Sequence, residues 1–391
     1  MTQQDYLSVQ PAYFGAEDLR VEDLDAVCSK TTQLTDFPLA MSVEKNVLIY
    51  DGDTMRSQLN NPADEARLKA EWCHALREGP GVFVVKRGYP NTSIIDRSTD
   101  LFRVIVAEEK AKGQGQGDHF GKNERIWNAI EKVCLKDPNL FIDYYTNSIL
   151  AIASESWLAP FYQITAQVNN VKPGSKAQST HRDYHLGFQS AGTVARFPAH
   201  AQVMSQYLTL QGAIAHTDMP IETGPTLILP YSHQFKAGYQ AYTFPQYDAY
   251  FQEHKVQLPL DKGDMIFFSP ALFHGAGSNQ SQSDRIANLV QISSAFGRTM
   301  ETVNTTRMVL AIYPTLLTRL EQNTLTEHEL HHLVAAVANG YSFPTNLDSD
   351  PPIGGNAPQT EQQLLQVALQ EKWTLEQLTL ALTAYSNRRQ A

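Results

Sequence analysis

Apolar and polar residues alternate along the middle of the chain in short runs, and Gly, Pro, Asn and Asp separate one run from the next. Alternation with a period of two places every second side chain on one face, as in a β-strand with one buried face. The runs that we expect to form strands are 162–171, 207–216, 226–229, 255–258, 265–268 and 286–293. Their number and spacing predict an antiparallel sandwich or jelly roll.

Apolar residues spaced by three and four positions predict helices on both sides of this region. Pro62 opens the first of them, and a short buried strand (82–85) follows it. The expected helices span 62–78, 94–112, 123–136, 139–157, 306–321, 326–338, 360–370 and 374–387. The chain therefore divides into a mostly helical part (1–160) packed on the core, a β core (161–298) and a C-terminal helical extension (299–391). A separate C-terminal helical lobe is the alternative for the last part.

Charge and composition narrow the class of protein. The formal net charge of −10 argues against nucleic acid or an anionic membrane surface as the main partner. The sequence has no run of 18 apolar residues, and its first residues lack the pattern of a signal peptide, so we expect no membrane span and no secretion. The cysteines are odd in number and widely spaced, which predicts a cytoplasmic protein without a disulfide framework: Cys28, Cys73 and Cys134.

An H-x-D sequence is the strongest chemical signal. In a strand, His181 and Asp183 share one face while Arg182 points to the other. His274 follows a second expected strand, and Arg285 follows His274. Two imidazoles and one carboxylate are the ligands of non-haem Fe(II) centres that leave coordination positions open. A guanidinium shortly after the last ligand is what a dicarboxylate cosubstrate needs.

Three blocks of sequence carry a resemblance to a known family. They are residues 181–188, the acidic-Gly-Pro-Ser-His segment 222–233, and the stretch from Gly263-Asp264 to Arg285. With these blocks the chain resembles the phytanoyl-CoA dioxygenase family of Fe(II)/2-oxoglutarate-dependent oxygenases, over roughly residues 80–298. The resemblance implies a double-stranded β-helix, a jelly roll of the cupin type, over 161–298.

The resemblance also implies roles for single residues. His181, Asp183 and His274 would hold Fe(II), and Arg285 would pair with the distal carboxylate of 2-oxoglutarate through its two-pronged guanidinium. Thr226 stands where related enzymes place a hydroxyl near the same carboxylate. With O2, such an enzyme hydroxylates a small organic molecule and converts 2-oxoglutarate to succinate and CO2. Related halogenases replace the carboxylate ligand with a small residue, so Asp183 favours hydroxylation. Family members act on fatty acyl thioesters, amino acid derivatives and natural-product scaffolds.

The strand before the H-x-D sequence has one polar face, which either faces solvent, as is usual for such strands, or lines the active site, as the resemblance implies. Gln163 and Gln167 on that face are our candidates for holding cosubstrate or substrate. A Gly-rich segment, 113–117, is a candidate hinge beside the pocket, and Lys122 and Arg125 near it would add positive charge at the entrance or sit at a solvated helix start.

Two other classes of function stay open. His328, Glu329 and His332 form an H-E-x-x-H sequence, which in zinc metallohydrolases supplies two metal ligands and a general base. The same residues also fit the wet face of an ordinary amphipathic helix. The third class is a β-helix binding module without catalysis. The C-terminal helices are candidates for a pocket cover or a homodimer contact.

Overall fold

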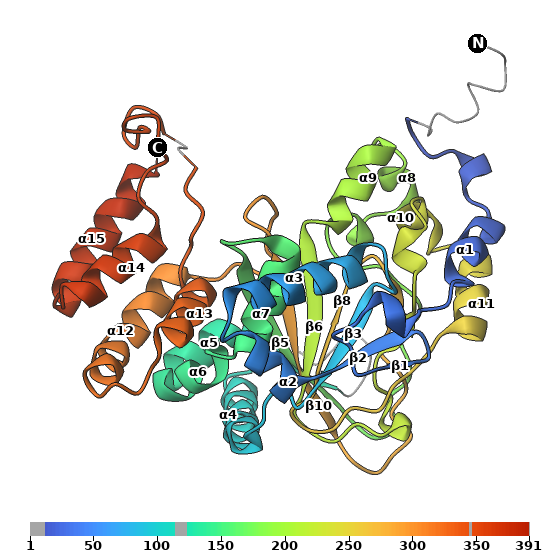
Figure 1. Ribbon diagram of the computed structural model, residues 1–391, viewed down its shortest axis with the longest axis horizontal. Coiled ribbons are helices and arrows are strands. Elements are labelled where there is room, and N and C mark those ends of the chain that lie inside the picture. Colours follow the sequence, from blue (N-terminus) through green and yellow to red (C-terminus); the bar gives the residue numbers. More distant parts are fainter. Residues whose placement is uncertain (1–11, 114–122, 344–345, 391) are drawn as a thin grey trace.

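The computed structural model describes residues 12–113, 123–343 and 346–390 (Figure 1). Its centre is an eight-stranded sheet in the order β1-β2-β3-β8-β6-β10-β5-β4, in which only β2 and β3 pair in parallel. The strands are β1 (Ser42–Glu44), β2 (Val47–Asp51), β3 (Val82–Lys86), β4 (Glu124–Ile126), β5 (Gln163–Val171), β6 (Thr209–Ala215), β8 (Met265–Phe268) and β10 (Arg285–Ser293).

A second, smaller sheet pairs β7 (Leu227–Leu229) with β9 (Phe273–Gly275). The two sheets enclose an apolar interior to which both contribute, for example Ile228 from the small sheet and Ala213 and Ile266 from the large one. This two-sheet arrangement with flanking helices confirms the predicted double-stranded β-helix, a mainly β core of the jelly-roll and cupin type.

The period-two pattern explains why both faces of the large sheet are covered. On β10, Ile286, Val290 and Ile292 belong to the apolar cluster on the helical side, whereas Ala287 and Leu289 face the interior between the sheets. The helices that cover this side and flank it are α3 (Pro62–Arg77), α4 (Thr92–Ala111), α5 (Ala129–Lys136), α6 (Pro138–Tyr145), α7 (Ser148–Leu158), α12 (Thr305–Glu321) and α13 (Glu327–Val337) (Figure 1).

The C-terminal helices α14 (Glu361–Gln370) and α15 (Leu375–Arg388) lie farthest from the sheet (Figure 1). They pack on α12 through residues such as Leu365 and Leu382, which have no exposed surface. These residues belong to the same cluster of buried apolar side chains that reaches the strands. The apolar core thus runs without a break from the sheet to α15, and the division of the chain into three parts stays a prediction.

Several expected elements differ from the observed ones. The expected helix 123–136 begins as strand β4, and the expected helix 139–157 is two helices because Asn147 caps the second by accepting from the Leu150 N–H. The expected strand 255–258 is reduced to one bridge between Val256 and Ile228. Helices that we did not predict are α1 (Val21–Cys28), α2 (Gly52–Gln58), α8 (Ala191–Val194), α9 (Ala199–Gln206), α10 (Gly238–Ala241) and α11 (Pro245–His254).

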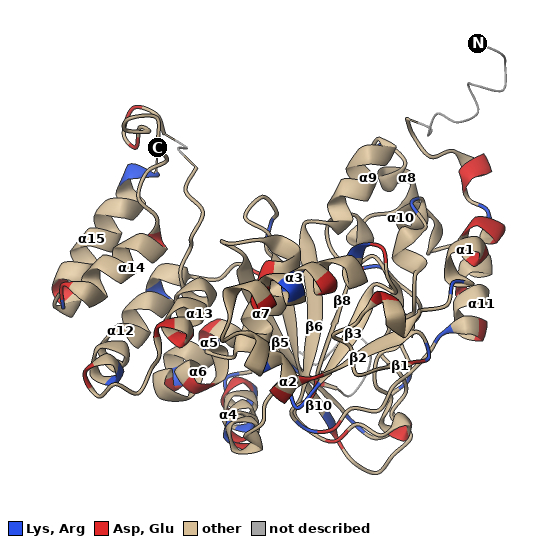
Figure 2. Cartoon of the chain, viewed as in Figure 1, with Lys and Arg blue, Asp and Glu red and all other residues tan. Residues whose placement is uncertain are grey.

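Charged residues of both signs are interspersed over the helices and loops, whereas the inner strands carry few (Figure 2). On β5, β6, β8 and β10 the one charged residue is Arg285. Its position on an inner strand is therefore a feature that needs a specific explanation. In the described part of the chain, no helix has both the length and the apolar character needed to cross a bilayer.

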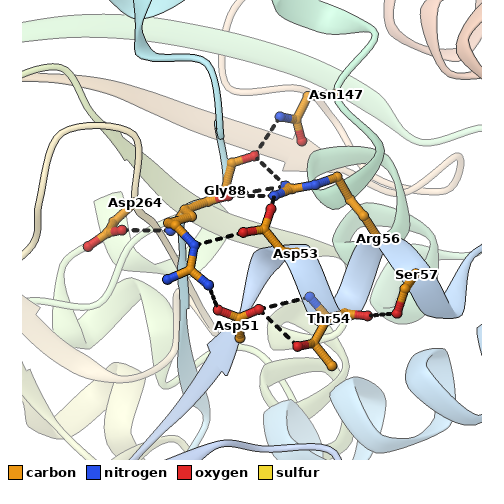
Figure 3. Close-up of polar contacts among 9 residues, drawn as sticks. Asp51, Asp53, Thr54, Arg56, Ser57, Gly88, Asn147 and Asp264 are labelled. Carbon is orange, nitrogen blue, oxygen red and sulfur yellow. Dashed lines mark hydrogen bonds and ion pairs between the residues drawn. The ribbon is translucent and has the colours of Figure 1, made fainter.

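A network of ion pairs and hydrogen bonds fixes the edge where β2, β3 and β8 meet (Figure 3). Asp51 caps α2 by accepting from the Thr54 N–H at 2.8 Å and pairs with Arg87. Asp53 accepts from the Arg87 Nε at 2.8 Å. The backbone N–H of Arg87 donates to Asp264, again at 2.8 Å. Asp51 is therefore both the last residue of β2 and the N-cap of α2.

Asp264 of the Gly263-Asp264 pair is buried, and both of its carboxylate oxygens accept hydrogen bonds in this network. Its carboxylate accepts from the Arg87 N–H, from the Asp261 N–H and from the Lys86 Nζ. The role of this acidic residue in the sequence block is thus to close the turn before β8, which leads toward His274.

Asp264→Ala is expected to lower the free energy of unfolding by roughly 3 kcal/mol, because it leaves two partly buried N–H groups and a half-buried ammonium without their acceptor. Asp261→Ala is the matched control: its carboxylate pairs with the same Lys86 but is 77% exposed, so its loss is expected to cost less than about 1 kcal/mol. Urea unfolding measures both values, and equal losses would contradict the assigned role of Asp264.

Candidate metal centre

Two backbone hydrogen bonds bring the H-x-D segment to β9. The His181 N–H donates to the His274 carbonyl at 3.0 Å, and the His274 N–H donates to the His181 carbonyl at 3.1 Å. The two residues form an isolated antiparallel bridge, and the pairing does not extend into a longer ladder. The Asp183 N–H donates to the Pro270 carbonyl at 3.0 Å, which holds the third residue against the same hairpin.

The three side chains converge on one point. One ligand atom from each of His181, Asp183 and His274 lies within 4.8 Å of the others. The His181 Nε2 is 3.7 Å from Asp183 Oδ1, and the His274 Nε2 is 3.4 Å from Asp183 Oδ2. Within the described residues this is the one group of three His, Cys, Asp or Glu side chains arranged closely enough for a shared metal ion.

The imidazoles are oriented by carbonyl groups behind them. The Nδ1 atoms of His181 and His274 lie 2.9 Å from the carbonyl oxygens of Ser179 and Leu272, respectively. A carbonyl only accepts, so Nδ1 carries the proton and Nε2 presents its lone pair to the centre of the cluster. Burial lowers the pKa of His181, which keeps the ring in the neutral form that binds metal.

Asp183 is held as a carboxylate. Burial alone would raise its pKa, but the adjacent imidazoles of His274 and His181 and the amide of Gln211 lower the pKa well below its ordinary value. The Gln211 Nε2 donates to Oδ2 at 2.5 Å. The set of two neutral nitrogens and one ionised oxygen suits divalent iron.

Arg182, on the opposite face, ties the H-x-D segment to the block 222–233. Its guanidinium lies 5.1 Å from the ring centroids of Tyr239 and Phe273 and donates to the carbonyls of Ser232 and Phe235 at 2.6 and 2.9 Å. The Ser232 hydroxyl also accepts from the Phe273 N–H at 2.8 Å, next to His274. The conformation of both ligand segments therefore depends on this one buried arginine.

The cluster opens into a cavity of about 450 Å³ that Arg285 and Thr226 also line. Arg285 is only 6% exposed and has no carboxylate partner among the described residues. Burial lowers the pKa of Arg285 to about 10, so the side chain stays charged at neutral pH. A buried cation facing a cavity needs an anionic ligand. The residues present thus fit Fe(II) and a dicarboxylate.

The two glutamines predicted from the polar face of β5 have different positions. Gln167 lines the cavity together with Asn169, and its Oε1 accepts from Arg125 at 2.9 Å. Gln163 instead lines a separate cavity beside Ala335 and Asn339. Gln163 begins β5 and Gln167 lies four residues later, so roughly 13 Å of strand separates them and they reach different cavities.

The expected positive entrance is only partly described. Arg125 lines the cavity, and its guanidinium lies 4.9 Å from the ring centroid of Trp127. It comes from β4 rather than from a helix start. Lys122 and residues 114–117 of the expected Gly-rich hinge lie outside the described residues.

Sequence reasoning missed several residues of the cavity wall: Trp127, Phe188, Gln211 and Met300. A signal existed for Gln211, because it is a polar residue at an inward position of an otherwise apolar strand. The other three belong to connecting segments, for which the sequence pattern carries no positional information.

The H-E-x-x-H sequence lies on α13, away from this cavity. The carboxylate of Glu329 accepts from the N–H and hydroxyl of Thr326 in a capping box, so it serves the start of the helix. His331, between the two motif histidines, contacts Glu155 of α7. In the described part of the chain these side chains do not form a three-ligand cluster, so the metallohydrolase alternative receives no structural support.

The fold and the cluster define a class: double-stranded β-helix proteins with a His-Asp-His group inside the barrel. The chain belongs to the phytanoyl-CoA dioxygenase (PhyH) family, whose sequence profile matches residues 63–287. This confirms the family resemblance derived from the three sequence blocks.

Two curated relatives carry the name dioxygenase. Dioxygenase cdmD of Talaromyces verruculosus is 28% identical over 141 residues, which are 36% of this chain and 42% of that protein. Dioxygenase trt7 of Aspergillus terreus (strain NIH 2624 / FGSC A1156) is 30% identical over 138 residues, 34% of this chain and 43% of that protein. The matched segments thus span less than half of each relative's length.

Similar solved structures include two proteins from nogalamycin biosynthesis. The epimerase SnoN, in complex with Fe3+, alpha ketoglutarate and nogalamycin RO, is 16% identical over 60% of this chain and 85% of its own, with a TM-score of 0.41. The non-heme alpha ketoglutarate dependent carbocyclase SnoK is 20% identical over 59% of this chain and 86% of its own, with a TM-score of 0.42. Scores this low carry no weight for function.

The His331–Glu155 contact predicts a pH dependence of stability. Glu155 raises the pKa of His331 by a hydrogen bond, against the opposing effects of burial and Lys69. A raised folded-state pKa adds stability that is fully present below the unfolded pKa of about 6.5 and disappears as pH rises through the folded value. The wild-type melting temperature should therefore fall slightly between pH 6 and 8, whereas that of His331→Ala should fall less. Parallel slopes in thermal melts would contradict this.

Proposed function

We propose that this protein is a non-haem Fe(II)/2-oxoglutarate-dependent dioxygenase that hydroxylates, or otherwise oxidises a C–H bond of, a small organic molecule. The observation that carries the proposal is the buried Arg285, which faces the same cavity as His181, Asp183 and His274 without a carboxylate partner among the described residues. Membership of the family and the names of the two relatives support it.

Each proposed residue has a separate task. The Nε2 atoms of His181 and His274 and one oxygen of Asp183 would hold Fe(II), a ligand set typical of iron centres that also bind cosubstrates. Arg285 binds and orients the distal carboxylate of 2-oxoglutarate, and the hydroxyl of Thr226 lies in the same cavity wall. When bound, Fe(II) with 2-oxoglutarate and O2 supplies the oxidising chemistry, and 2-oxoglutarate leaves as succinate and CO2.

The rest of the wall indicates the substrate class. Trp127, Phe188 and Met300 offer apolar surface, whereas Gln167 and Asn169 offer amide groups. Such a wall suits an apolar skeleton with a few hydrogen-bonding oxygens, as in natural products. A catalytic core over 161–298, a cytoplasmic location and a homodimer contact of the C-terminal helices remain predictions.

A binding module without catalysis is the weaker alternative. Its expected signature is the loss of a ligand or of the arginine, and the chain retains all four residues. The metallohydrolase alternative lacks both a clustered ligand set and a free general base among the described residues.

Succinate formation tests the proposed function. Anaerobically purified protein supplied with Fe(II), 2-oxoglutarate and air is expected to form succinate slowly without substrate, and His181→Ala is expected to lose at least about 99% of this activity because one ligand is gone. His200→Ala, which changes an exposed histidine, is the control and should keep wild-type activity. Equal succinate from His181→Ala and wild type would refute the proposal.

Arg285→Met tests the cosubstrate site through stability. Because the substitution removes a buried unpaired charge, the ligand-free variant should melt at or above the wild-type temperature. With Mn(II) already present, addition of 2-oxoglutarate should further raise the melting temperature of the wild type and leave that of Arg285→Met nearly unchanged, since the anion loses its partner. Arg285→Lys should show an intermediate shift, because a single ammonium replaces a two-pronged donor. A wild-type shift of the melting temperature in Arg285→Met would show that the distal carboxylate of 2-oxoglutarate does not bind Arg285.

A further inference from the structure

Gln211 connects the carboxylate of the cluster to a second amide. Its Nε2 donates to Asp183 Oδ2 at 2.5 Å and to Gln291 Oε1 at 3.2 Å. Gln211 on β6 and Gln291 on β10 are direct partners in the register of the two strands. Both side chains are buried, and both line the cavity.

The direction of these bonds follows from the chemistry of the groups. An ionised carboxylate only accepts hydrogen bonds, so the nitrogen of Gln211, and not its oxygen, must face Asp183. The second N–H of the same nitrogen then points at Gln291, which must present its oxygen. Both protons of the Gln211 amide are thus used, and the orientation of two amides is determined by one carboxylate.

We propose that Gln211 is a positioning residue that fixes Asp183 as a metal ligand through a single oxygen, and that Gln291 holds Gln211 in place. This rests on the proposed function of the cluster. With Oδ2 engaged by Gln211, Oδ1 is the carboxylate oxygen without a hydrogen-bond partner among the described residues, and it faces the Nε2 of His181 at 3.7 Å. Rotation of the carboxylate would break the bond to Gln211.

Partners of this kind affect metal binding measurably, since removing a hydrogen bond to a ligand typically weakens metal affinity by 10- to 100-fold. Gln211→Leu removes both donors while keeping the volume similar. Gln291→Leu removes only the acceptor that holds Gln211, so a smaller loss is expected. Gln291→Glu still presents an oxygen to Gln211 and should bind metal at least as tightly as the wild type.

The test is anaerobic titration of each variant with Mn(II) alone, alongside thermal melting of the metal-free proteins. Gln211→Leu should bind about 10- to 100-fold more weakly, Gln291→Leu a few-fold more weakly. The double variant should bind no more weakly than Gln211→Leu, because Gln291 acts through Gln211. Gln362→Leu is the matched control: its amide donates to the Ala338 carbonyl in the C-terminal part at 3.0 Å, and its metal affinity should be that of the wild type.

Unchanged affinity in Gln211→Leu, or additive losses in the double variant, would overturn the inference. If Gln211→Leu does not fold, Gln291→Leu and its rescue by Gln291→Glu decide the question instead. His181→Ala separates the two proposals: if it binds Mn(II) as tightly as the wild type, the proposed centre itself fails. If binding depends on His181 and not on Gln211, only the positioning role fails.

Discussion

The pair of backbone hydrogen bonds between His181 and His274 is the constraint on which the site depends. It joins a segment without regular strand structure to β9, and it places two imidazoles with ring centroids 4.5 Å apart. His274 is also paired with Ile228 of β7, whereas His181 belongs to no helix or strand and depends on this bridge. Arg182 supports the pair from the opposite face, because its guanidinium packs against the ring of Phe273 and donates to the carbonyls of Ser232 and Phe235. The face of the H-x-D segment that carries His181 and Asp183 and the face that carries Arg182 are therefore stabilised by the same contacts.

The placement of polar groups inside the barrel has an energetic cost that apolar packing elsewhere offsets. The interior beside β7 and β8 is apolar, with Ile228, Ile266 and Leu272 nearly free of exposed surface. The cavity side of the same interior holds Arg285, Gln211 and Gln291, groups that cost free energy to bury unless they are paired. Gln211 is hydrogen-bonded to Asp183 and to Gln291, whereas Arg285 has no carboxylate partner within the described residues. Gln211 and Gln291 therefore stabilise the site, whereas Arg285 is the group proposed to bind a ligand.

The fold class was predictable because it depends on periodicity. The alternation along 162–171 and 286–293 correctly predicted the two longest strands, β5 and β10, with small shifts at their ends. The short helices α8 to α11 were not predicted, since they lie between strands and their packing on the ligand segments, not local spacing, makes them helical. Strand β4 was not predicted for a similar reason. Its three residues form a strand only by pairing with β5, and the helical pattern of the adjacent α5 led us to expect one helix over 123–136.

The residues proposed as ligands could be named because their chemistry is rare and their spacing resembles a family. The prediction grouped Gln163 with Gln167 because a polar face predicts which side of the sheet a residue faces, but not where along the strand the site lies. The two glutamines point to the same side of β5 and still line different cavities. Gln211 was missed for the opposite reason, since one amide in an apolar strand has no partner in the local sequence.

The register of β10 with its neighbouring strands determines which of its side chains reach the cavity, and this register cannot be read from the local sequence. Along the inward face of this strand, Arg285 comes first, then Ala287 and Leu289, then Gln291. Gln291 stands opposite Gln211 on one side and Thr165 on the other. A slip of one residue would turn every one of these side chains to the helical face. The apolar residues Val290 and Ile292, buried against the helices, prevent that slip. The helical side of the sheet thereby determines which polar groups reach the cavity, although none of its residues lies in the site.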